Sequence, residues 1–133
     1  MTSTTTLVCI AILGALVFLL GANVTRHRAQ RGATGNQMPT DPSDRMLIAQ
    51  RAHGNAIEYV PTLAVLLLVA GSLTDGWWVP TLAVAAVVAR LLHAVGMLTS
   101  KTLATHGPLR DAGAMGTYLT GVALSITVVV AAL

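Results

Sequence analysis

Four apolar stretches separated by short polar connections dominate the pattern of hydrophobic and polar positions along the chain. The first stretch, residues 7–24, carries no charge, and the others cover about residues 46–73, 79–98 and 112–133. A helix of about 20 apolar residues is long enough to cross a bilayer, so each stretch has the length of a transmembrane helix. We therefore predict an all-α fold, an integral membrane four-helix bundle with four transmembrane helices that form a single domain over residues 1–133.

The composition also favours a membrane protein. Of the 133 residues, 54% are hydrophobic and only 10% are charged, and the mean hydropathy is +0.71. Soluble domains carry about 25% charged residues, so this chain lies outside their range. Aromatic residues are few and do not alternate with basic ones, so we expect membrane lipids and no nucleic acid as partners.

A cleaved signal peptide is the alternative interpretation of the first apolar stretch. It is disfavoured because no charged segment precedes residues 7–24, whereas a basic cluster follows them. The single cysteine, Cys9, lies inside this stretch, so no disulfide within the chain is possible. We expect Cys9 to be a free thiol that packs as a small hydrophobic residue.

The basic residues indicate how the helices are oriented. They are concentrated in two connections, expected at about residues 25–45 and 99–111, whereas the connection between them carries only Asp75. By the positive-inside rule, the two basic connections are cytoplasmic, and both termini and the Asp75 turn lie on the opposite side. Trp77 and Trp78 follow that turn, where an interfacial aromatic belt would place them.

A polar stripe runs along the predicted second helix. Arg51, Asn55 and Glu58 stand at positions i, i+4 and i+7, and Tyr59 and Thr62 follow on the same side. A charged side chain at the centre of a spanning helix costs about 2.5–3.5 kcal/mol. We therefore expect this stripe to face a protein partner or a wet cavity rather than lipid.

The predicted third helix carries its own polar stripe of Arg90, His93 and Met97. Counting from the turn that the two helices share, Glu58 lies about 22 Å deep, His93 about 21 Å and Arg90 about 17 Å. The long Arg90 side chain can reach several ångströms further. A carboxylate, a guanidinium and an imidazole are thus expected at similar depth in the cytoplasmic half.

Two interpretations of this constellation remain open. In the first, Glu58 and Arg90 form a structural ion pair that only fixes the register of the helices. In the second, the stripes form a site for a polar, anionic ligand that enters from the cytosol. Arginines bind carboxylates, Glu58 suits an ammonium group, and Asn55 offers both donor and acceptor. The second interpretation is favoured because an ion pair does not explain the shared stripe of Arg51, Asn55 and Tyr59.

Two motifs in these stripes resemble the MAPEG superfamily, the membrane-associated proteins of eicosanoid and glutathione metabolism, and most closely its small bacterial branch. The motifs are Arg51-Ala-His-Gly-Asn55-Ala-Ile-Glu58-Tyr59-Val-Pro61 and Ala89-Arg90-Leu-Leu-His93-Ala-Val-Gly96. The resemblance implies a homotrimer of four-helix subunits. With the positive-inside orientation, it also implies an integral protein of the bacterial cytoplasmic membrane.

The resemblance further implies glutathione, or another low-molecular-weight thiol, as a co-substrate bound between subunits near the cytoplasmic side, and no metal. The residues expected to contact the thiol are Arg51, His53, Asn55, Glu58, Tyr59, Arg90 and His93. Met97 departs from the pattern, because eicosanoid-synthesising members often carry a tyrosine at the matching position. One hydroxyl contact is therefore absent here.

Catalysis in active relatives is attributed to an arginine at the start of the fourth helix that stabilises the thiolate. A cysteine thiol has a pKa near 8.5, and a neighbouring cation lowers this pKa. Arg110, within Pro108-Leu-Arg-Asp111, is the matching catalytic candidate. An ordinary loop charge at a helix start is the other interpretation of Arg110.

The sequence therefore favours an integral membrane glutathione transferase-like enzyme that conjugates or reduces lipophilic electrophiles, with a microsomal-type transferase or peroxidase activity. The alternative is a non-catalytic lipid-binding or ligand-binding protein on the same scaffold. A small four-span drug exporter is a third function, but such exporters depend on a carboxylate in the first span. Residues 7–24 contain none.

Overall fold

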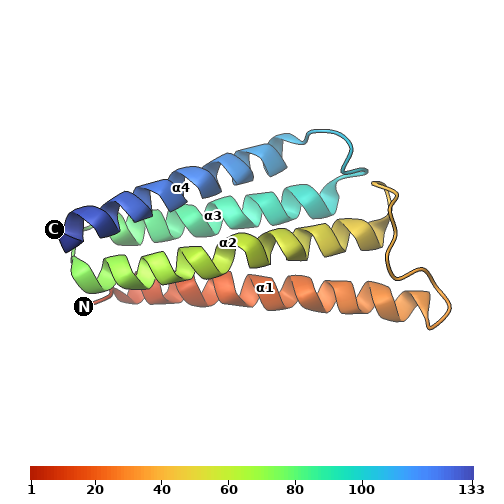
Figure 1. Cartoon of the computed structure of the whole chain (residues 1–133), viewed down its shortest axis with the longest axis horizontal. Coiled ribbons are helices and arrows are strands. Elements are labelled where there is room, and N and C mark those ends of the chain that lie inside the picture. The colour runs from red at the N-terminus through yellow and green to blue at the C-terminus, as the bar shows by residue number, and fades with distance from the viewer.

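The computed structural model describes all 133 residues and contains four helices and no strands. The helices are α1 (Thr4–Arg31), α2 (Arg45–Leu73), α3 (Trp78–Thr99) and α4 (Pro108–Ala132). They run up and down side by side, so that both termini lie at one end of the bundle (Figure 1). Each helix is long and apolar enough to cross a membrane, which confirms the predicted all-α, four-span fold.

The four helices do not contribute equally to the core. Helices α1, α2 and α3 supply nearly all of the buried apolar cluster, and from α4 only Leu124 belongs to it. Helix α4 packs against α3 and α2 but does not contact α1. Its other buried residues are small or polar: Gly113, Thr117 and Thr120. Small residues let helix backbones approach closely in a bilayer, where the hydrophobic effect does not drive association.

The closest approach of two helices is the crossing of α3 and α4. A Cβ atom added to Gly113 would overlap the backbone of His93, and one added to Gly96 would overlap the backbone of Arg110. A Cβ atom on Gly116 would lie 2.9 Å from the Cβ atom of Ala89. Only glycine allows this approach at the first two positions, and the crossing therefore fixes the start of α4 against α3.

Two helices extend further than their apolar stretches. Helix α1 continues through the basic cluster to Arg31, so the first connection is shorter than the expected residues 25–45. Arg28 and Arg31 occupy its last turn, where cations complement the helix dipole. Helix α4 begins at Pro108, because proline suits the first turn of a helix, and Arg110 therefore lies in a helical turn rather than in the loop.

The first connection is closed by an ion pair. Asp44 is the N-cap of α2 and accepts a hydrogen bond from the backbone N–H of Met46 at 2.8 Å. Its carboxylate also pairs with the guanidinium of Arg31 at the end of α1. One carboxylate thus accepts hydrogen bonds from the free N–H groups at the start of α2 and joins this helix to α1.

The two connections at this end of the bundle are also joined to each other. Arg45 donates hydrogen bonds to the carbonyl oxygens of Leu98 (2.6 Å) and Ser100 (2.9 Å), which lie at the end of α3. The backbone N–H of Leu103 donates to the carbonyl of Pro42 at 2.8 Å. These bonds hold the segment that leads into α4, and with it the position of Arg110.

Candidate functional site

Arg90 is the centre of a polar cluster inside the bundle. Its side chain is only 1% exposed, although it lies on a spanning helix. Its Nη2 atom donates to Asn55 Oδ1 at 2.8 Å and its Nη1 atom to Thr117 Oγ1 at 3.5 Å. The guanidinium also lies 5.5 Å from the centroid of the Tyr59 ring, within the range of a cation–π contact. Partners from α2 and α4 therefore surround this cation.

His93, one turn further along α3, is buried as well. Its Nδ1 atom lies 2.8 Å from the carbonyl oxygen of Arg110. A carbonyl oxygen can only accept, so Nδ1 carries the hydrogen and donates it. In the neutral imidazole, Nε2 is then an acceptor with a free lone pair. The α4 backbone thus sets the tautomer of His93.

Two buried polar atoms of this cluster have no hydrogen-bond partner: Arg90 Nε and His93 Nε2. Leaving a buried donor or acceptor unpaired costs about 1–3 kcal/mol, so native proteins rarely do so without a reason. Arg90 Nε is a donor, and His93 Nε2 is an acceptor when the imidazole is neutral. A polar ligand with both kinds of group would satisfy them.

Tyr59 and Tyr118 form an aromatic pair beside this cluster. The Tyr59 hydroxyl donates to the Tyr118 hydroxyl at 3.4 Å, and the ring centroids are 5.7 Å apart. The pair lines a cavity of about 430 Å³ between α2 and α4. The cavity is lined by Tyr59, Thr62, Leu63, Leu66, Thr117, Tyr118, Gly121, Val122 and Ser125.

Thr117 and Tyr118 are residues of this site that were not predicted from the sequence. An isolated tyrosine in an apolar stretch resembles a lipid-facing aromatic residue. Depth is the signal that could have found Tyr118. It lies about 15 Å along α4 from Pro108, too far for the interfacial belt where tyrosines usually lie.

Arg51 and Glu58 lie on the surface of the single chain. Both side chains are exposed, and neither forms an ion pair. Glu58 is not paired with Arg90, which is bonded to Asn55 instead. The ion-pair interpretation therefore has no support in the structure, and Glu58 projects from a spanning helix without a partner in its own chain.

His53 lies apart from the Arg90 cluster. Its imidazole packs against α1, where a Cβ atom on Gly21 would lie 3.1 Å from His53 Nε2. It lines a different cavity, of about 440 Å³, with Arg28 and Gln50 under the first connection. Within one chain, the structure does not bring His53 together with Arg90 and Asn55.

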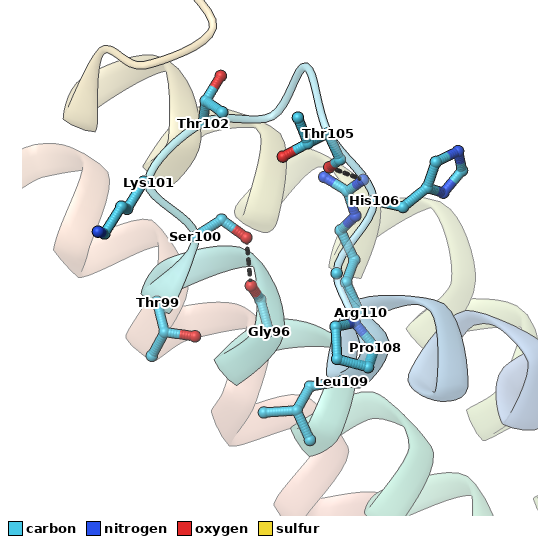
Figure 2. Close-up of a pocket in the computed structure, with 11 residues that line it drawn as sticks. Gly96, Thr99, Ser100, Lys101, Thr102, Thr105, His106, Pro108, Leu109 and Arg110 are labelled. Carbon is cyan, nitrogen blue, oxygen red and sulfur yellow. Dashed lines mark hydrogen bonds between the residues drawn. The ribbon is translucent and has the colours of Figure 1, made fainter.

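Arg110 lines a third cavity, of about 350 Å³, beneath the connection between α3 and α4 (Figure 2). Its Nη2 atom donates to the carbonyl oxygen of Thr105 at 2.7 Å. Figure 2 shows the guanidinium turned toward Thr105, whereas the side chains of Lys101 and His106 point outward. The hydrogen bond that joins Arg110 to the buried cluster comes through its backbone carbonyl, which accepts from His93 Nδ1.

The three predicted residues that the structure brings together are therefore Asn55, Tyr59 and Arg90, with His93 on the same helix as Arg90. Residues 6–130 match the family model described as the MAPEG family, which covers nearly the whole chain. No curated protein sequence matches the chain.

Proposed function

Since the chain belongs to the MAPEG family of membrane-associated proteins in glutathione and eicosanoid metabolism, we propose that it binds glutathione or a related low-molecular-weight thiol. With this thiol it conjugates or reduces lipophilic electrophiles that reach it through the bilayer. The site consists of the Arg90 cluster together with the exposed stripe of Arg51 and Glu58 on α2.

The observation that carries this proposal is the pair of unpartnered buried atoms, Arg90 Nε and His93 Nε2. Glutathione has two carboxylates, an ammonium group and two amides, so it offers acceptors for arginine and donors for a neutral imidazole. Glu58, exposed beside the cluster, suits the ammonium group. The donor set therefore fits the tripeptide without a metal.

We further propose that the chain works as a homotrimer. Arg51 and Glu58 are exposed on a spanning helix, and Glu58 lies near its middle, where contact with lipid costs a charged side chain about 2.5–3.5 kcal/mol. A second copy packed on this face would remove the charges from lipid and close the thiol site between subunits. The basic connections then lie in the cytoplasm, on the side of the bacterial membrane where the thiol is dissolved.

In this proposal Arg110 stabilises the thiolate, since a neighbouring cation favours the ionised thiol. One observation favours the second candidate, a non-catalytic ligand-binding protein: the Arg110 guanidinium is bonded to the Thr105 carbonyl rather than turned toward the cluster. Replacing Arg110 separates the two functions. In an enzyme, Arg110→Ala abolishes thiol-dependent turnover and spares thiol binding, whereas Lys101→Ala in the same cavity preserves both.

The experiment that tests the proposal is isothermal titration calorimetry of the detergent-purified protein with glutathione. The Arg51→Ala, Glu58→Ala double variant is titrated beside it, because both side chains are exposed and their removal leaves the core intact. We expect the wild-type protein to bind and the double variant to lose binding. A wild-type protein that binds neither glutathione nor other small thiols would contradict the proposal.

A further inference from the structure

The cavity between α2 and α4 has mostly apolar walls and carries the tyrosine pair at one end. Leu63, Leu66 and Val122 are among the apolar residues deeper in the span, and Thr62 and Ser125 add two hydroxyl groups. The cavity opens on the surface of the bundle, where Tyr118 is 50% exposed and Val122 is 60% exposed. In the single chain, a molecule dissolved in the bilayer can therefore reach the cavity from the side without passing through water.

Of the hydroxyl groups that α4 contributes to this cavity, only that of Tyr118 keeps its hydrogen free for a ligand. Thr117 donates its hydroxyl hydrogen to the carbonyl of Gly113 (2.8 Å), and Ser125 donates to the carbonyl of Gly121 (2.9 Å). Tyr118 instead accepts a hydrogen bond from Tyr59, and its own hydrogen is available to a ligand.

The neighbourhood strengthens this donor. The Arg90 guanidinium stacks over the Tyr59 ring, and Tyr59 donates to Tyr118. Hydrogen bonds in a chain polarise one another, so the cation makes the terminal hydroxyl a better donor toward an oxygen that gains negative charge. Thr117 both lines the cavity and accepts a hydrogen bond from Arg90, so the cavity adjoins the thiol site proposed above.

We propose that Tyr118 is a further catalytic residue, which donates a hydrogen bond to the carbonyl oxygen of a long-chain α,β-unsaturated carbonyl compound bound between α2 and α4. The proposal rests on the proposed thiol-dependent function and names the class of electrophile. The apolar chain of the electrophile lies along the cavity, and its carbonyl oxygen meets the tyrosine pair next to Arg90.

The reaction step is a conjugate addition. The thiolate sulfur forms a bond to the β-carbon of the enone, and the π electron pair moves through the α-carbon to the carbonyl oxygen. Tyr118 stabilises the enolate oxygen through its hydrogen bond. The enolate then takes a proton from water at the α-carbon, which balances the proton that the thiol released on ionisation. No oxidant or reductant is needed.

Tyr118→Phe removes the donor and keeps the ring. Thiol-dependent turnover is measured with nonenone, a long-chain enone, and with benzyl chloride, an electrophile without an oxygen. Removing one oxyanion donor costs about 10²–10³-fold in rate. We expect the ratio of kcat/KM for nonenone to that for benzyl chloride to fall by about this factor. Thr81→Val, which removes a hydroxyl from the exposed face of α3, should leave the ratio at its wild-type value.

A spectroscopic measurement separates this inference from the proposed function. The carbonyl stretching band of bound ¹³C-labelled nonanone, an unreactive saturated analogue, should lie at lower frequency in the wild-type protein than in Tyr118→Phe. A band that is the same in both proteins, or an equal loss of turnover with both electrophiles, would overturn the role of Tyr118. If no thiol supports turnover, the proposed function fails, and the infrared band still decides whether Tyr118 binds the carbonyl.

Discussion

At the scale of single residues, Arg90 is the charge around which the interior of the bundle is organised. It lies on α3 and is bonded to Asn55 on α2 and to Thr117 on α4. Removing a hydrogen-bond partner from a buried guanidinium is costly, because the charge then keeps fewer polar contacts in an apolar environment. The hydrogen bond to Asn55 is shorter than that to Thr117, so we expect Asn55 to stabilise the buried Arg90 more than Thr117 does.

Asn55→Ala should destabilise the protein by about 1.5–3 kcal/mol, the range for a hydrogen bond to a charged group. The free energy of unfolding can be measured in mixed micelles with increasing denaturing detergent. Ser72→Ala is the control, since Ser72 is an exposed residue of α2 that bonds only to the carbonyl of Val69. Equal stability of the two variants would show that Arg90 does not depend on Asn55.

The sequence predicts some of this cluster and not the rest. Spacing places Asn55 and Tyr59 on one stripe of α2 and Arg90 on α3 at a similar depth. Depth does not fix how each helix is rotated about its axis, and the rotation turns Glu58 outward and Asn55 toward Arg90. Tyr118 could not be paired with Tyr59 from the sequence because α2–α4 packing depends on the whole bundle.

At the scale of helices, the crossing of α3 and α4 positions the start of α4. Gly113 packs against the backbone of His93, and Gly96 packs against that of Arg110. This contact brings the Arg110 carbonyl within reach of the His93 imidazole and so selects its tautomer. Gly113, Thr117 and Gly121 are small residues at four-residue spacing, a pattern that allows a close helix approach, but the sequence does not name the helix that packs there.

Gly113→Ala should separate α4 from α3, destabilise the protein by about 1–3 kcal/mol and weaken thiol binding. Gly14→Ala is a matched control, since a Cβ atom on Gly14 meets nothing within 4 Å. Alanine favours a helix over glycine by about 1 kcal/mol, so this control should be slightly stabilised. Unfolding in mixed micelles measures both, and a stabilised Gly113→Ala would contradict the close crossing.

The junction of α1 and α2 should make stability depend on pH. The hydrogen bond from Arg31 is the main cause that lowers the pKa of Asp44 below its usual value, and the backbone N–H groups of Met46 and Leu47 add to it. The unfolded Asp has a pKa near 3.9. Because the folded pKa is lower, this stabilisation is present above about pH 4 and is lost as the pH falls through the folded pKa.

Asp44→Asn removes the titration but keeps a side-chain oxygen that can cap α2. We expect the stability of the wild-type protein to fall more steeply than that of the variant as the pH is lowered from about 6 to below 4. The free energy of unfolding of both proteins, followed by circular dichroism at each pH, measures this difference. Parallel curves would show that the Arg31–Asp44 pair does not contribute.

At the scale of the whole molecule, one chain forms a complete bundle but leaves charged side chains on its membrane-spanning surface. Hydropathy predicts the four spans correctly because its value is averaged over about 20 residues, so a few polar positions do not hide a span. The same averaging hides the exposed Arg51 and Glu58. In the proposed function, a neighbouring subunit covers this surface, and a polar ligand pairs the buried atoms of Arg90 and His93 that have no partner in the chain.

Native mass spectrometry of the protein, released from detergent in the presence of glutathione, tests for the neighbouring subunits and for the bound thiol at once. We expect a particle of three chains that carries bound thiol. The Arg51→Ala, Glu58→Ala variant should lose the thiol and dissociate more readily, because both side chains lie on the face that the next copy covers. A wild-type protein that is released as single chains without thiol would show that this polar stripe is not a thiol site closed by a neighbouring subunit.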